Sequence, residues 1–147
     1  MKVDSINGKI LKCLQQNARL SNAEIGRQVG ISSPAVSERI RKMEDAGVIE
    51  GYNTIVSPDE IGYQFKAIIT LRAFMGKLKP FLEKVKTYDE VINCYRITGD
   101  ENIVMEVVLK NQKHLEAFID QLISYGESKT QIVLSRVIKN KEIIPIN

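Results

Sequence analysis

The chain has 147 residues, of which 44% are hydrophobic and 27% are charged, a composition typical of a globular protein and not of a disordered or fibrous one. Its formal net charge of +3 is too small to indicate a nucleic-acid partner, so any such partner must be argued from the positions of the charges. No apolar run reaches the ~18 residues that cross a bilayer, and the amino terminus lacks the apolar stretch of a signal peptide. We therefore expect a cytoplasmic protein with one ordinary domain or two small ones.

The two cysteines, Cys13 and Cys94, fall within helix or strand patterns far apart in the sequence. We expect both to be buried and reduced, as isolated cysteines commonly are. With a single histidine, His114, and no CxxC pair, the chain has too few ligands for a structural zinc site. We predict neither a metal nor a cofactor.

Two short amphipathic helices are predicted at the start of the chain. Asp4 is a good N-cap for the first, which ends near residues 16–17. The second begins at Ser21, because Ser21 and Glu24 have the spacing of a capping box, and Gly30 supplies its left-handed stop. The apolar residues expected on the inner faces are Ile6, Ile10, Leu11, Leu14, Ile25 and Val29.

A third helix is predicted between Ser33 and Gly47. Ser33 is its expected N-cap, and Pro34 takes the first helical position, where its missing N–H costs nothing. Helices this short cannot each bury an apolar stripe alone, so we expect the three to pack together. The inner face of the third helix carries Val36, Ile40 and Met43.

The outer face of this third helix has the order of side chains that a DNA recognition helix needs. Small or hydrogen-bonding side chains come first, where base edges lie, and cationic ones follow a turn or two later, near phosphates. The alternative is a solvated face of ion pairs along the helix. The capped helix upstream and the short turn between the two favour DNA. The residues predicted to bind DNA are Ser21, Asn22, Ser32, Ser33, Pro34, Ser37, Glu38, Arg39, Arg41 and Lys42.

After the third helix the sequence changes to β-branched and aromatic residues broken by Gly51. We predict strands over residues 48–49 and 52–56, which would form a small wing, and a linker over residues 58–63. The predicted division is thus a helix-turn-helix domain with a short wing over residues 1–57, the linker, and a second domain over residues 64–147.

The second domain is predicted to contain four strands and two helices in the order βαββαβ. This order favours a ferredoxin-like sheet with both helices on one face, which makes the fold class α+β with a winged helix-turn-helix head in front. The strands are expected over residues 66–74, 91–97, 103–109 and 130–138, and the helices over residues 78–88 and 113–125.

The other face of this sheet has no cover within the chain. An exposed sheet with this much apolar bulk would be a liability, so we predict a homodimer formed face to face. The tail over residues 139–147 is expected to add an edge strand, with Pro145 limiting its pairing. The outward-facing strand residues include Ile68, Thr70, Arg72, Val104 and Val108.

Five residues between the second and third strands, Thr98, Gly99, Asp100, Glu101 and Asn102, are candidates for a ligand-binding loop. One interpretation is a simple hairpin turn, which Gly-Asp suits well. The other is a site for an amino acid, in which free backbone N–H groups bind the carboxylate and Asp100 binds the ammonium.

The order of these features resembles the Lrp/AsnC, or feast/famine, family of bacterial and archaeal transcription regulators. The resemblance covers nearly the whole chain and is strongest over residues 38–52, ERIRKMEDAGVIEGY. It implies a DNA-binding head, a ligand-sensing ferredoxin-like domain, dimers that assemble to octamers, and an amino-acid effector. It also implies an effector pocket between dimers at residues 98–102, with help from Asp120 of a neighbouring subunit. Many members have an aromatic residue and then Asp where this chain has Glu101 and Asn102.

Two other classes of protein fit the sequence less well, and a third stays open. An enzyme is disfavoured because no nucleophile is evidently paired with His114, and we expect a surface histidine. An RNA-binding sheet is disfavoured because the strand over residues 103–109 has no aromatic residue on which a base could stack. A member of the same family that does not bind DNA, or does not need a ligand, and only co-assembles with other regulators stays open as the alternative.

Overall fold

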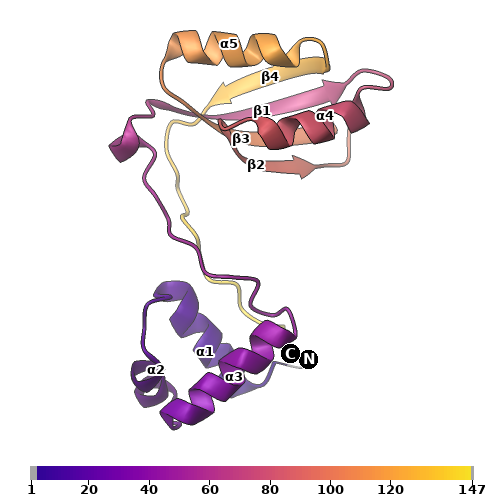
Figure 1. Ribbon diagram of the computed structural model, residues 1–147. Helices are drawn as coiled ribbons and strands as arrows, with labels where there is room; N and C mark the ends of the chain where they lie inside the picture. The colour runs from indigo at the N-terminus through magenta and orange to yellow at the C-terminus, as the bar shows by residue number, and fades with distance from the viewer. Residues whose placement is uncertain (1–2, 147) are drawn as a thin grey trace. The chain divides into compact units, whose positions relative to one another are not determined.

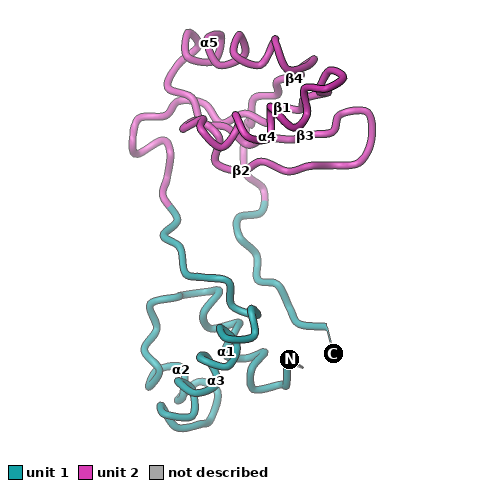
Figure 2. Tube along the Cα trace, turned by 45° about the vertical axis from the view of Figure 1, so that its right-hand side comes forward, with its two compact units in different colours: residues 1–55, 138–147 teal, residues 56–137 magenta. Residues whose placement is uncertain are grey.

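The computed structural model describes residues 3–146, which form two compact units (Figures 1 and 2). The first unit, which we call the head, comprises residues 1–55 together with residues 138–147. The second, which we call the sheet unit, spans residues 56–137. The chain therefore leaves the head once and returns to it.

The head contains helices α1 (Ser5–Gln16), α2 (Asn22–Val29) and α3 (Ser33–Asp45). α1 begins where Asp4 Oδ1 accepts a hydrogen bond from the Asn7 N–H at 2.7 Å. α2 begins with the predicted capping box and ends at Gly30, whose φ of 80° is left-handed. Both starts were predicted from the sequence and are confirmed, since each rests on side-chain chemistry a few residues long.

The predicted N-cap of α3 is wrong by one residue. Ser32, not Ser33, has the extended backbone of a cap, and its Oγ accepts from the Ala35 N–H at 3.4 Å. Pro34 is thus the second helical residue, where its N–H would still have no partner within the helix. Two consecutive serines before proline offer two caps, and spacing alone does not choose between them.

The three helices of the head close over one apolar cluster. Ile25 of α2 and Val36 and Met43 of α3 are fully buried against Ile10 of α1, with Cys13 beside them. The other five inward residues predicted for the head are partly buried and pack against this cluster: Ile6, Leu11, Leu14, Val29 and Ile40. The periodicity of the sequence therefore identified the inner faces.

Gly26 sets how closely α2 can approach the start of α3. Its carbonyl accepts from the N–H groups of Gly30 at 2.9 Å and Ile31 at 3.1 Å. A Cβ atom on Gly26 would lie 2.5 Å from the Ile31 carbonyl oxygen, a distance that side chains do not tolerate. The turn between the two helices therefore requires glycine at this position.

The predicted wing strands over residues 48–49 and 52–56 are not formed. The N–H groups of Val48 and Ile49 donate instead to the Met43 carbonyl, at 2.8 and 3.2 Å, and close the end of α3. Residues 50–57 then run exposed, and the Tyr52 hydroxyl donates to Glu44 at 2.8 Å. β-branched composition is not enough for a strand, because the backbone groups also need a pairing partner.

The sheet unit opens with the short 3-10 turn η1 (Asp59–Ile61) and has a four-stranded sheet with the order β2-β3-β1-β4, all neighbours antiparallel (Figure 1). This is the predicted ferredoxin-like arrangement. Its elements are β1 (Phe65–Ala73), α4 (Leu78–Lys84) with the turn η2 (Val85–Thr87), β2 (Val91–Arg96), β3 (Ile103–Leu109), α5 (Gln112–Leu122) and β4 (Gly126–Ile132).

Both helices cover the same face of the sheet, as predicted. Phe81 of α4 and Phe118 of α5 are fully buried against alternate residues of the two central strands. Those strand residues are Ala67, Ile69, Leu71, Ile103, Met105, Val107 and Leu109.

The last strand lies four residues earlier than the prediction of residues 130–138. β4 starts at Gly126, opposite Ala73, and a Cβ on Gly126 would lie 2.3 Å from the Arg72 carbonyl oxygen. The sequence over residues 126–129 resembles a turn, yet glycine allows the strand to begin in close contact with β1. Residues 133–138, which have the stronger strand composition, form no strand.

The face of the sheet opposite the two helices is partly exposed to solvent. Ile68, Thr70 and Val104 are half-buried, Val108 is buried, and Lys66 pairs with Glu106 at 3.2 Å. The face is therefore mixed in character, with apolar side chains beside an ion pair.

The tail does not form the predicted edge strand. No strand occurs within residues 139–146, and residues 138–147 group with the head. The tail is yellow in Figure 1 and teal in Figure 2, and hydrogen bonds from Gln15 and Gln16 hold it to α1.

We expect Gly26→Ala to destabilise the head by about 1–3 kcal/mol, because the new methyl group must push the turn at Ile31 away from α2. Native-state hydrogen exchange at the amides of α2 and α3 measures the free energy of opening. Gly51→Ala is the control, since no atom lies within 4 Å of its added Cβ. Equal opening free energies in the two variants would contradict the close approach.

Candidate functional site

The outer face of α3 brings most of the predicted DNA-binding residues together. The first turn of the helix presents small polar groups and the later turns present cations, so the order expected from the sequence is kept in space. Ser32, Pro34, Ser37, Glu38, Arg41 and Lys42 are exposed, and Ser33 is half-buried.

The cations of this face are paired along the helix. Arg41 donates to Asp45 at 3.0 Å and to Glu38 at 3.2 Å, and Lys42 lies 3.3 Å from Glu38. These hydrogen bonds, those from Arg41 first, hold the pKa of Glu38 below its usual value, and the Glu38 contact raises the pKa of Arg41. The groups are about half or more exposed, so water screens the pairs and a phosphate could replace the carboxylates at little cost.

Arg39 has a different environment from the other two cations. Its Nη1 donates to Asp4 Oδ2 at 2.8 Å and to Asn7 Oδ1 at 2.9 Å, and Asn7 is only 3% exposed. The guanidinium therefore joins α3 to the start of α1. The Arg39 contact lowers the pKa of Asp4, after the larger effect of the Asn7 N–H. A contact between Arg39 and DNA stays a prediction.

Ser21 and Asn22 stand at the start of α2. The Ser21 hydroxyl donates to Glu24 at 2.8 Å and accepts from the Glu24 N–H at 3.2 Å, so the capping box occupies it. The Ser21 backbone N–H, which also donates to Glu24, is the main cause of the lowered pKa of that carboxyl. Asn22 is half-buried.

In the sheet unit, the predicted ligand loop is fixed at one end and open at the other. Asn102 holds it to β1: its N–H donates to Leu71 at 3.2 Å, and its Oδ1 accepts from the Ala73 N–H at 3.1 Å. Thr98, Gly99 and Asp100 are exposed. Within the described residues, no hydrogen bond uses the backbone N–H groups of residues 98–101, and these can bind a carboxylate.

Lys129 is a neighbour of this loop that sequence reasoning missed. It pairs with Glu101, and this contact is the main cause of the lowered pKa of that carboxyl. Arg72 and Glu127 form a second pair on adjacent strands. The prediction placed the start of β4 after Lys129, and the alternation of Glu127, Lys129 and Gln131 on one face was the signal available.

Asp120 is exposed on α5, and no hydrogen bond or ion pair joins it to the loop of residues 98–102 in the part of the chain that is described. A shared site would need a second subunit.

The single histidine and the two cysteines, all within the described residues, show no sign of a catalytic or metal site. His114 is half-buried, not on the open surface: its Nδ1 accepts from the Lys110 N–H at 3.1 Å, which leaves Nε2 to donate to Glu90 at 2.8 Å. Cys13 is buried as expected, but Cys94 is exposed, because β2 is an edge strand. Residues 3–146 contain no group of three metal-ligating side chains and no helix with the length and hydropathy of a membrane span.

Each of the two units matches a known protein family. Residues 3–50 match the winged helix-turn-helix DNA-binding family model, and residues 66–143 match the Lrp/AsnC ligand binding domain. The HTH-type transcriptional regulator Ptr1 of Methanocaldococcus jannaschii is 33% identical, over 98% of this chain and 99% of that protein.

Two solved structures are similar over almost their whole length. LrpC of Bacillus subtilis has a TM-score of 0.90 at 28% identity and covers 94% of this chain and 99% of its own. The transcriptional regulator NMB0573 of Neisseria meningitidis, solved with L-Met, has a TM-score of 0.91 at 25% identity and covers 97% and 96%. These relatives are regulators and not enzymes, and the chain belongs to the Lrp/AsnC family of transcription regulators.

Proposed function

We propose that the chain is a cytoplasmic, sequence-specific DNA-binding transcription regulator whose assembly or affinity for DNA responds to a small amino acid. The observation that supports this most directly is the outer face of α3, where exposed serines precede Arg41 and Lys42. The helix follows a tight turn that requires glycine at position 26. That arrangement suits a helix whose amino-terminal residues meet base edges in the major groove.

On DNA, the carboxylates of α3 would take one of two roles. Glu38 can accept a hydrogen bond from the amino group of cytosine, or it can act only as the resting partner of Arg41 and Lys42. In either case Arg41 must exchange Glu38 and Asp45 for DNA. The exchange is feasible because these pairs are exposed to solvent.

The proposed effector is an amino acid bound at residues 98–102. The free N–H groups of this loop suit its carboxylate, and Asp100 suits its ammonium. The L-Met in the Neisseria relative supports this ligand class for the family. Glu101 and Lys129 add one charge of each sign beside the loop, and Asp120 of another subunit would complete the pocket.

The proposed homodimer is supported by the mixed face of the sheet and by the geometry of DNA. Two heads related by a twofold axis would bind two half-sites about one helical turn apart. The half-buried Ile68 and Val104 are the apolar residues that a second copy would cover, and further assembly to an octamer is proposed from the family resemblance.

The alternative is a member that co-assembles with related regulators without binding DNA or ligand itself. The observation in its favour is that every cation on the outer face of α3 already has a carboxylate partner.

Arg41→Ala should weaken binding to a duplex selected from random sequences by about 10- to 100-fold if Arg41 contacts a base. If it contacts only phosphate, all sequences should weaken alike and the salt slope should fall by about one. Fluorescence anisotropy over a range of salt concentrations measures both. Lys79→Ala, a change of an exposed cation on α4, should alter neither; an Arg41 variant that behaves like it contradicts the assignment of this face.

Asp100→Ala should abolish the thermal shift produced by whichever of the twenty amino acids stabilises the unmodified protein. A ligand at a hundredfold excess over its Kd contributes about 2.7 kcal/mol to stability, so the shift is measurable by differential scanning fluorimetry. Asp89→Ala is the control, because it removes an exposed carboxylate outside the loop. A full thermal shift in the Asp100 variant would remove this residue from the site.

Ile68→Lys should convert the dimer to a monomer, because two cations would face each other across the proposed interface. Glu106, the partner of Lys66, lies opposite residue 68 on β3 and gives the new lysine a nearby carboxylate, so the monomer should stay folded by circular dichroism. Light scattering gives the mass. Met75→Lys, at a fully exposed position, is the control, and a dimer that survives Ile68→Lys speaks against this face.

A further inference from the structure

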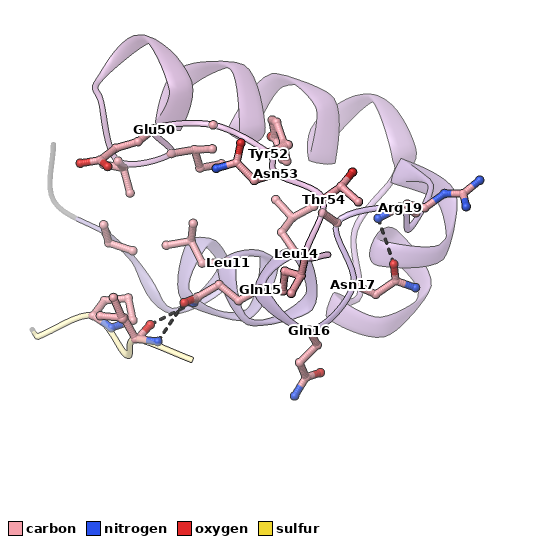
Figure 3. A pocket seen from close by; sticks show the side chains of 18 of the residues that line it. Leu11, Leu14, Gln15, Gln16, Asn17, Arg19, Glu50, Tyr52, Asn53 and Thr54 are labelled. Atoms are coloured by element: carbon pink, nitrogen blue, oxygen red, sulfur yellow. Dashed lines mark hydrogen bonds between the residues drawn. The ribbon is translucent and has the colours of Figure 1, made fainter. Parts of the chain in front are cut away.

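The carboxyl-terminal tail makes specific contacts with the DNA-binding head. Gln15, on the exposed side of α1, donates from Nε2 to the Ile143 carbonyl at 3.0 Å and accepts from the Ile143 N–H at 2.8 Å. The dashed lines beside Gln15 in Figure 3 mark these two bonds. One side-chain amide thus satisfies both backbone groups of one tail residue, as a neighbouring strand would.

Two further contacts fix the direction of the tail. Gln16 donates to Glu142 Oε1 at 2.7 Å, and a Cβ placed on Gly8 would lie 3.9 Å from Pro145 Cγ, an ordinary packing distance. The tail therefore runs antiparallel to α1, with residue 142 near the end of the helix and residue 145 near its beginning. The hydrogen bond from Gln16 also holds the pKa of Glu142 below its usual value.

The docked tail also forms one wall of a surface groove on the head, shown in Figure 3. Leu11 and Leu14 of α1 and residues 48–55 form the other walls, and Pro145 and Ile146 contribute from the tail. The side chain of Ile143 stays 81% exposed, so its backbone and not its side chain anchors it. The position of the tail therefore depends on the two glutamines more than on apolar burial.

We propose that residues 142–146 form a C-terminal clasp on α1 that gives the helical part of the head, residues 3–55, a second tether to the sheet unit and limits the orientations this part can take. The first tether is residues 56–64, between the head and β1, and the second is residues 133–141, between β4 and the clasp. Each tether is nine residues long and reaches about 30 Å at most.

The clasp acts by lowering the conformational entropy of the head relative to the sheet unit. A head held by a single flexible segment can rotate about its attachment point, whereas a head held at two points of its surface loses part of that freedom. The clasp needs neither DNA nor an effector, so its test is independent of the proposed regulatory function.

Hydrogen exchange at the Ile143 amide in the full-length protein tests the clasp directly. We expect Gln15→Ala to accelerate this exchange about tenfold, because the amide loses its acceptor. Gln121→Ala removes an exposed glutamine of α5 and should leave the rate unchanged. A wild-type Ile143 amide that exchanges as fast as in an unstructured peptide, or a rate unaltered by Gln15→Ala, would overturn the proposal.

Charge changes at Gln16 should shift the exchange rate of the Ile143 amide in opposite directions. Gln16→Lys should slow exchange at Ile143 by placing a cation beside Glu142, and Gln16→Glu should accelerate it by placing two carboxylates together. Changes in the same direction in both variants would show that Glu142 does not face this residue.

The restriction of the head is measured by ¹⁵N relaxation of its backbone amides. In the unmodified protein we expect the correlation time of the head to lie closer to that of the sheet unit than it does when the tail is released. In Gln15→Ala, and in a chain that stops after Ile138, the head should tumble faster than the sheet unit. Unchanged relaxation of the head in a variant whose Ile143 amide has become unprotected would overturn the second-tether role.

Discussion

The close approach of α2, at Gly26, to the turn that precedes α3 is the constraint on which the proposed DNA-binding face depends. Because residue 26 has no side chain, its carbonyl can accept from both Gly30 and Ile31, and the chain turns within a few residues into the cap at Ser32. The cap in turn sets the rotation of α3 about its axis. Val36 and Met43 then point into the core, and Arg41 points to solvent.

The parts of the fold that could be predicted from the sequence are those decided by interactions between residues close together in the chain. The capping box at Ser21, the glycine stop of α2 and the inner stripes of the three head helices are patterns of a few residues, and the structure has them where they were expected. Errors arose where a partner distant in sequence decides. Residues 52–56 have strand composition but no strand to pair with, whereas the turn-like residues 126–129 form part of β4 because β1 lies beside them.

The same distinction applies to the candidate sites. The order of side chains on α3 could be predicted, since helical geometry fixes which residues share a face. That Arg39 is engaged by Asp4 and Asn7 could not, because the contact spans more than thirty residues. Lys129 was missed for the same reason: its pairing with Glu101 depends on the register of β4 against β1. The DNA-binding and effector roles of these residues stay predictions.

The unequal exposure of the two cysteines has a practical consequence. Cys13 is buried in the head, where its thiol donates to Gln28, whereas Cys94 is exposed on the edge strand β2. A maleimide dye should therefore attach to the native chain at one place, on the sheet unit. The protein thus carries its own attachment point for fluorescent or spin probes, and no cysteine needs to be engineered to follow the sheet unit during assembly.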